Sequence, residues 1–84
     1  MSLDKGCVVL ATAGKEKGRA MAVVGSDNRF VLLADGRKRP IERPKRKNPR
    51  HIKSADFRLD ISTLSSNREL RRALADSRCL LTDK

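Results

Sequence analysis

The sequence predicts a small, mainly β fold with a short α-helix near its C-terminal end. Three short apolar runs, at 7–11, 20–24 and 30–34, are separated by glycines and turn-forming polar residues. Each run is too short for a helix and contains β-branched residues, which is typical of strands. In the last third of the chain, a capping box precedes leucines at helical spacing. We therefore expect an antiparallel β unit followed by one helix.

The first half of the chain supplies three of the expected strands. Residues 6–12 form the first, the Gly-x-x-x-Gly loop at 14–18 reverses the chain, and residues 19–24 form the second. The polar residues 26–28 predict a turn. Residues 29–34 form the third strand, and its unbroken apolar character indicates burial on both faces, with the C-terminal segment as the cover of one face.

The next segment is irregular and basic. Asp35-Gly36 predicts a turn, and residues 40–42 are expected to form a short edge strand, where a proline is tolerated. Pro44 and Pro49 keep the chain extended and prevent a helix. Residues 51–53 are expected to form the last strand, with its isoleucine in the core.

The tail carries the helix signal. Ser66 is the expected N-cap of a helix over 67–77, with Leu70 and Leu74 facing the β unit. Between the basic segment and this helix, apolar and polar residues alternate over 57–62. That alternation fits either another strand or an extended linker.

A chain of 84 residues forms one domain with at most an appendage. We expect a β unit with its basic segment at 1–54 and an extension at 55–84. No apolar stretch resembles a signal peptide or a membrane span, so a cytoplasmic protein without membrane contact, monomeric when free, is expected. Cys7 and Cys79 are then reduced thiols, and two cysteines with a single histidine cannot complete a zinc site.

The charge distribution is the strongest compositional signal. The net charge is +10, and residues 37–53 hold nine Lys or Arg against one Glu, which is +8 of that total. Such a concentrated charge predicts a polyanionic partner, and nucleic acid fits better than a membrane surface. The alternative is a solvated basic loop without a partner.

Several of these features resemble a known family. A Gly-x-Val-Val start at 6–9, the Gly-x-x-x-Gly loop at 14–18 and the valine pair at 23–24 resemble a KOW motif. The continuation through 28–36 and 39–43 is similar to the fourteen-e group of large-subunit ribosomal proteins and their small bacterial KOW-domain relatives. The similarity spans roughly the first two thirds of the chain. It implies an SH3-like β-barrel that binds RNA, commonly ribosomal RNA.

The candidate RNA-binding residues come from the glycine loop and the basic segment. Arginine can bind phosphate through two hydrogen bonds, and lysine contributes a point charge. The loop residues could equally be solvated side chains of an ordinary hairpin, but the basic segment favours RNA contact. The predicted set is Lys15, Lys17, Arg19, Arg37, Lys38, Arg39, Arg43, Lys45, Arg46, Lys47, Arg50 and Lys53.

Other classes of function lack support in the sequence. Phe30 and Phe57 are the only aromatic residues and are expected in the core, which disfavours recognition of single strands by stacking. His51 has no nucleophile nearby in sequence, and no nucleotide-binding fingerprint is present. We expect no catalysis, cofactor or metal.

These observations favour a non-catalytic RNA-binding protein of the translation apparatus. Its partners would be ribosomal RNA and neighbouring ribosomal proteins, with structured RNA recognised through its backbone. The alternative is a protein-interaction adaptor that docks an acidic protein. A third hypothesis is DNA binding by the same basic surface.

Overall fold

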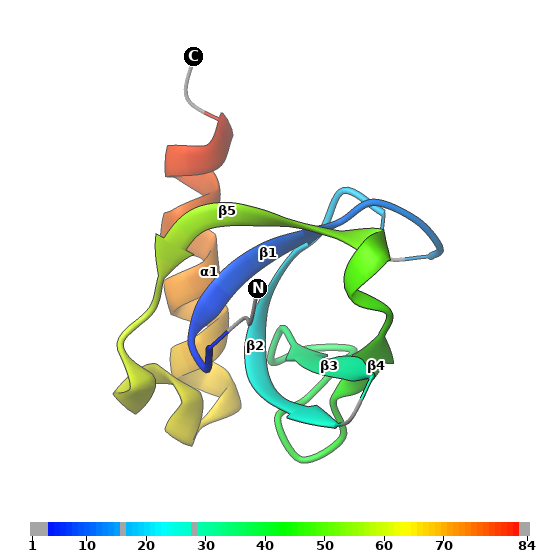
Figure 1. The fold of residues 1–84 in the computed structure, drawn as a ribbon. Coiled ribbons are helices and arrows are strands. Elements are labelled where there is room, and N and C mark those ends of the chain that lie inside the picture. Colours follow the sequence, from blue (N-terminus) through cyan, green and yellow to red (C-terminus); the bar gives the residue numbers. More distant parts are fainter. Residues whose placement is uncertain (1–3, 16, 28, 83–84) are drawn as a thin grey trace.

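A computed structural model of the chain describes residues 4–15, 17–27 and 29–82, with the side chains in this range other than those of residue 56 and residues 77–82. Five strands, two 3₁₀ turns and one helix follow one another along the chain (Figure 1). The strands are β1 (Cys7–Ala11), β2 (Ala20–Asp27), β3 (Phe30–Ala34), β4 (Lys45–Lys47) and β5 (Ile52–Arg58). The turns are η1 (Pro49–His51) and η2 (Ile61–Ser65), and the helix is α1 (Asn67–Thr82).

The strands form one antiparallel sheet in the order β4-β3-β2-β1-β5, which confirms the mainly β prediction. β2 is longer than expected, and its register with β3 shifts between Val23 and Gly25. After this irregularity, Ser26 and Asp27 pair with β3 instead of forming the expected turn. Asn28, the third residue of that turn, lies outside the described residues.

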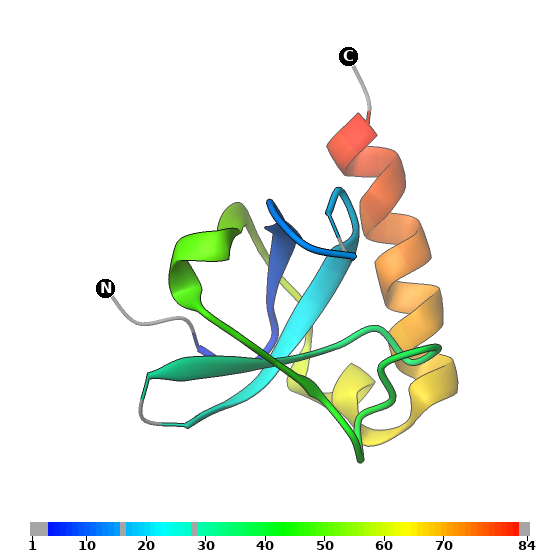
Figure 2. The same cartoon turned by 90° about the vertical axis from the view of Figure 1, so that its right-hand side faces the viewer.

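Both faces of the sheet are buried. On one face, Val8, Ala22 and Ala34 pack with Leu70 and Leu74 of α1, as Figure 2 shows by the position of the helix beside the sheet. On the other face, a second cluster contains Val9, Met21, Val23, Val31 and Leu33, with Ile52 packed against it. Because neighbouring residues of a strand point to opposite faces, burial on both sides produces unbroken apolar runs. The expected double-sided burial of the third strand holds in part: Val31 and Leu33 lie in one cluster and Ala34 in the other, whereas Phe30 and Leu32 are half-buried.

Helix α1 begins where the capping box predicted. The Ser66 hydroxyl accepts a hydrogen bond from the Glu69 backbone N–H at 3.1 Å, and Leu70 is fully buried. The helix continues to Thr82, five residues beyond the expected end, because residues 78–82 contain neither glycine nor proline to stop it. In the part of the chain that the structure describes, no helix is both long enough and apolar enough to cross a membrane.

The strand expected at residues 40–42 was wrong. The Arg43 backbone N–H donates to the Pro40 carbonyl at 2.9 Å, which makes a turn, and the Ile41 N–H donates to Asn67 instead of to a strand. The edge strand is β4, between Pro44 and Pro49. Proline at position 49 begins η1, so β5 starts one residue later than expected, at Ile52, and continues to Arg58.

The two phenylalanines and Cys7 differ in how far they are buried. Phe57 packs against the cluster beneath α1, as expected. Phe30 is only half-buried and lies outside both clusters. Cys7 is a half-buried free thiol against the second cluster, and the side chain of Cys79 lies outside the described residues.

Candidate nucleic-acid interface

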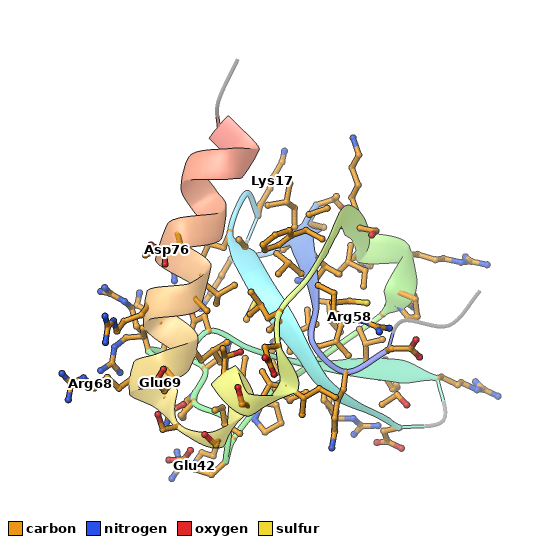
Figure 3. The ribbon with its side chains drawn as sticks, turned by 90° about the vertical axis from the view of Figure 1, so that its left-hand side faces the viewer. Lys17, Glu42, Arg58, Arg68, Glu69 and Asp76 are labelled. Atoms are coloured by element: carbon orange, nitrogen blue, oxygen red, sulfur yellow. The ribbon has the colours of Figure 1, made fainter. Side chains whose placement is uncertain are left out.

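The loop between β1 and β2 presents the first group of cations. The Ala11 N–H donates to the Arg19 carbonyl at 3.1 Å, and the Gly18 N–H donates to the Ala11 carbonyl at 2.8 Å. Gly18 has a φ of 84°, a conformation that other residues rarely adopt, and this allows the tight return into β2. The loop exposes Lys15, Lys17 and Arg19, and Figure 3 shows Lys17 pointing away from the sheet.

The segment after β3 presents the second group, and Asp35 shapes it. One carboxylate oxygen of Asp35 accepts from the backbone N–H groups of Arg37 and Arg39, at 2.8 and 3.0 Å. The backbone N–H groups of Asp35 and Gly36 both donate to the Arg39 carbonyl. This compact turn fixes the backbone of residues 37–39, so their cationic side chains project from a defined base.

The two groups meet in a hollow of about 290 Å³ lined by Lys15, Arg19, Lys38 and Arg39, which we call the cationic pocket. All four lining residues carry positive charge. A nearby carboxylate, that of Asp35, lies 3.8 Å from the Arg19 guanidinium. Like charges held close together repel, and a bound anion relieves that repulsion. The pocket therefore suits phosphate groups.

A second hollow of about 380 Å³ adjoins the first and shares Arg19 with it. Its lining includes Arg19, Arg37 and Arg71 around the apolar residues Ala20, Leu74 and Ala75, and we call it the arginine groove. Arg71 comes from α1, and its guanidinium donates to the Gly36 carbonyl at 2.7 Å. The groove is therefore formed by three segments: the helix, the turn after β3, and the end of the glycine loop with the start of β2.

Helix α1 also holds the turn after β3 in place. The side-chain amide of Asn67 accepts from the Ile41 backbone N–H at 2.8 Å and donates to the Glu42 carboxylate at 3.0 Å. In Figure 3, Glu42 lies below the first turn of α1. A Cβ atom on Gly36 would lie 2.5 Å from the Asn67 carbonyl oxygen, so only glycine allows this close packing. The C-terminal helix thus positions the cations of residues 37–39.

The remaining predicted residues do not line either hollow. Lys47 is buried, and its ammonium group donates to the Ala13 carbonyl at 2.8 Å. The Arg46 guanidinium lies 3.1 Å from the Asp27 carboxylate and 4.7 Å from the centre of the Phe30 ring. Lys45 is half-buried on β4, and the others, Lys17, Arg43, Arg50 and Lys53, are exposed.

The 3₁₀ turn η1 extends the basic surface. The Thr12 N–H donates to the His51 carbonyl at 2.8 Å, which places η1 beside the loop between β1 and β2 (Figure 1). Arg50 in this turn is exposed, and no acidic residue lies in its first turn. The surface around the glycine loop therefore combines cations from three separate segments.

Comparison with known proteins identifies the family. No model of a protein family matches the chain. The large ribosomal subunit protein eL14 of Staphylothermus marinus is 31% identical over 77 residues, which cover 90% of this chain and 80% of that protein. The chain belongs to the eL14 family. The match extends past the first two thirds of the chain into the C-terminal segment, and membership of a ribosomal protein family agrees with the prediction of a non-catalytic protein.

Three residues that shape this candidate interface of the eL14-family chain are not in the set predicted from the sequence. Asp35 could have been found, because an aspartate that accepts from the backbone two residues later is a known turn pattern. Arg71 and Asn67 could not, because nothing in the sequence shows that the turn after β3 packs on the helix.

The buried ammonium of Lys47 gives a first testable prediction. Lys47→Met keeps most of the apolar stem but leaves the Ala13 carbonyl without this donor. We expect the free energy of unfolding to fall by about 1–3 kcal/mol in urea denaturation. The matched control is Lys53→Met on the exposed side of β5, which should change stability by less than about 0.5 kcal/mol. Equal stability of the two variants would contradict a structural role for Lys47.

The contact between α1 and Glu42 gives a second prediction. The Asn67 hydrogen bond, then the backbone N–H of Glu42 itself, and more weakly Arg43, lower the pKa of Glu42 below its usual value. A lowered pKa in the folded state means that the contact stabilises above the unfolded pKa and is lost as the pH falls through the folded pKa. In Asn67→Ala the pKa of Glu42 should rise towards its ordinary value in an NMR titration.

Asp60 provides the internal control for this titration. Hydrogen bonds from the backbone and side chain of Ser62 lower the pKa of Asp60, and Asn67 is not among their donors. The pKa of Asp60 should therefore stay low in Asn67→Ala. A Glu42 pKa that does not respond to the substitution would show that Asn67 does not fix the turn after β3.

Proposed function

We propose that this chain is a non-catalytic ribosomal protein that binds ribosomal RNA through its phosphate backbone. The observation that carries the proposal is the cationic pocket, in which Lys15 and Arg19 of one loop meet Lys38 and Arg39 of another. The similarity to a large ribosomal subunit protein supports ribosomal RNA as the polyanion. In this proposal the protein acts in the cytoplasm within the large subunit, beside other ribosomal proteins.

The chemistry of the surface favours backbone recognition. Arginine and lysine side chains that neutralise phosphates release condensed counterions, which supplies affinity without reading bases. Neither phenylalanine offers a free stacking platform, because Arg46 lies over the Phe30 ring and Phe57 packs beneath α1. The cationic pocket would therefore contact structured RNA by shape and charge.

We infer that the sheet is curled into a partly open SH3-like barrel. Ile52 of β5 packs against the cluster that holds Val9 of β1, Met21 of β2 and Leu33 of β3, so four strands share one core on this face. The bent path of β2 in Figure 1 supports a curved sheet around that core.

A salt series tests the proposed function. Fluorescence anisotropy with a structured ribosomal RNA fragment should show that log affinity falls linearly with log salt. With roughly five phosphates neutralised, the slope should be about −4 to −5, by analogy with duplex DNA. If the RNA did not bind at low salt, or if its affinity did not depend on salt, phosphate binding would be contradicted. Either result would favour an adaptor that docks an acidic protein.

A further inference from the structure

The arginine groove has a lining that phosphate alone does not require. The cationic pocket is lined only by Lys and Arg, whereas Ala20, Leu74 and Ala75 line the groove together with its arginines. Ala75 is exposed and Ala20 is half-buried, whereas Leu74 is buried in the core, so the two alanines supply most of the apolar surface that is open to solvent. A ligand that fills the groove needs both a negative charge and a flat apolar part.

The cations of the groove are all arginines: Arg19, Arg37 and Arg71. A guanidinium is planar and weakly hydrated, so it can stack on a base as well as bind phosphate. Asp35 also lines the groove, but it repels an anion little. One of its carboxylate oxygens accepts two backbone N–H groups, and the other faces Arg19.

The groove is also held open by fixed contacts. Arg71 donates a hydrogen bond to the Gly36 carbonyl, and the Asn67 side chain accepts one from the Ile41 N–H. Leu74 belongs to the core beneath α1. A site whose walls are already ordered loses little conformational entropy when a ligand binds. Its volume of about 380 Å³ lies within the roughly 300–1,000 Å³ that is usual for small-ligand sites.

We propose that the arginine groove receives one unpaired nucleotide of the bound RNA. Its base lies against Ala75 and Ala20 beside the guanidinium groups, and its phosphate faces the cationic pocket across Arg19. Because Arg19 lines both hollows, an RNA strand whose phosphates occupy the pocket brings the adjacent nucleotide to the groove. The inference rests on the proposed RNA binding and adds that the protein prefers RNA with an extruded base.

The test compares two RNA hairpins with the full-length protein. One is fully paired and carries an additional nucleotide at its 3′ end, and the other has one unpaired adenosine in its stem, so both have the same number of phosphates. We expect about tenfold tighter binding of the second hairpin, the scale of one stacked base. In NMR spectra, both hairpins should shift the amide signals of Lys15 and Lys38, and only the second should shift those of Ala20 and Ala75.

A variant with a side chain that fills the arginine groove distinguishes nucleotide binding in the groove from phosphate binding in the cationic pocket. Ala75→Leu adds an apolar side chain at an exposed helical position, where leucine is tolerated well. It should abolish the preference for the unpaired adenosine and leave affinity for the paired hairpin unchanged. The control Ser62→Leu, at an exposed position in η2, should retain the preference.

Three outcomes would count against the inference. Equal affinity of the wild type for both hairpins, without shifts at Ala20 and Ala75, would overturn it and leave phosphate binding intact. A tenfold preference that persists in Ala75→Leu would also overturn it, because the base would then bind elsewhere. Failure of both hairpins to bind would overturn the proposed function together with the inference.

Discussion

The Lys15→Glu/Lys38→Glu variant is expected to bind structured RNA about a hundredfold more weakly than the wild type. A hydrogen bond to a charged group contributes about 1.5–3 kcal/mol, and each 1.4 kcal/mol is tenfold in affinity. Both lysines are exposed and lie on separate loops of the cationic pocket, so the fold should persist. Because the substitutions remove phosphate contacts, the salt dependence should also become shallower.

The matched control is Lys5→Glu/Arg29→Glu. Both residues are exposed, and the two substitutions change the total charge by the same amount as those in Lys15→Glu/Lys38→Glu. Lys5 precedes β1 and Arg29 follows β2, so both lie at the ends of these strands opposite to the glycine loop. We expect the affinity for structured RNA to fall by less than threefold, because only the overall positive field of the protein becomes smaller. Equal loss in the two variants would show that RNA responds only to net charge and that the cationic pocket has no special role.

Leu70→Ala is expected to lower the free energy of unfolding by about 2–5 kcal/mol, because it leaves a cavity in the contact between α1 and the sheet. Leu70 is fully buried against the cluster of Val8, Ala22 and Ala34. A domain of this size has a small free energy of unfolding, so a large fraction of the molecules would be unfolded at moderate temperature. Thermal and urea denaturation followed by circular dichroism would measure the effect.

Arg72→Ala on the same helix is the control for Leu70→Ala. Arg72 is exposed, and arginine and alanine both favour helix, so stability should change by less than about 0.5 kcal/mol. If Leu70→Ala unfolded at the same temperature and the same urea concentration as Arg72→Ala, α1 would not be part of the folded core. In that case α1 would not position residues 37–39 either.

The elements that carry strong periodic or capping signals could be predicted from the sequence. β1 and β3 lie where the apolar runs indicated, because residues such as Val31, Leu33 and Ala34 are buried in the clusters on the two faces of one sheet. The start of α1 followed from Ser66, whose hydroxyl accepts from the backbone in the expected way. Local chemistry decides these features, so a single sequence contains them.

Features that depend on contacts between distant segments could not be predicted. Lys47 was expected at the RNA surface, yet its ammonium group bonds the Ala13 carbonyl, 34 positions away in sequence. The turn at 40–42 replaces the expected strand because Asn67 accepts the Ile41 N–H. The meeting of Lys15 with Lys38 also depends on the turn after β3 being held on α1, which no local pattern shows.

We propose that this chain binds ribosomal RNA of the large subunit through the cationic pocket. Ultraviolet crosslinking of the full-length protein in its native cells, followed by sequencing of the attached RNA, tests it most directly. We predict that large-subunit ribosomal RNA is enriched with the wild type and strongly reduced with Lys15→Glu/Lys38→Glu. Large-subunit ribosomal RNA that is no more abundant than in an untagged control would contradict the claim.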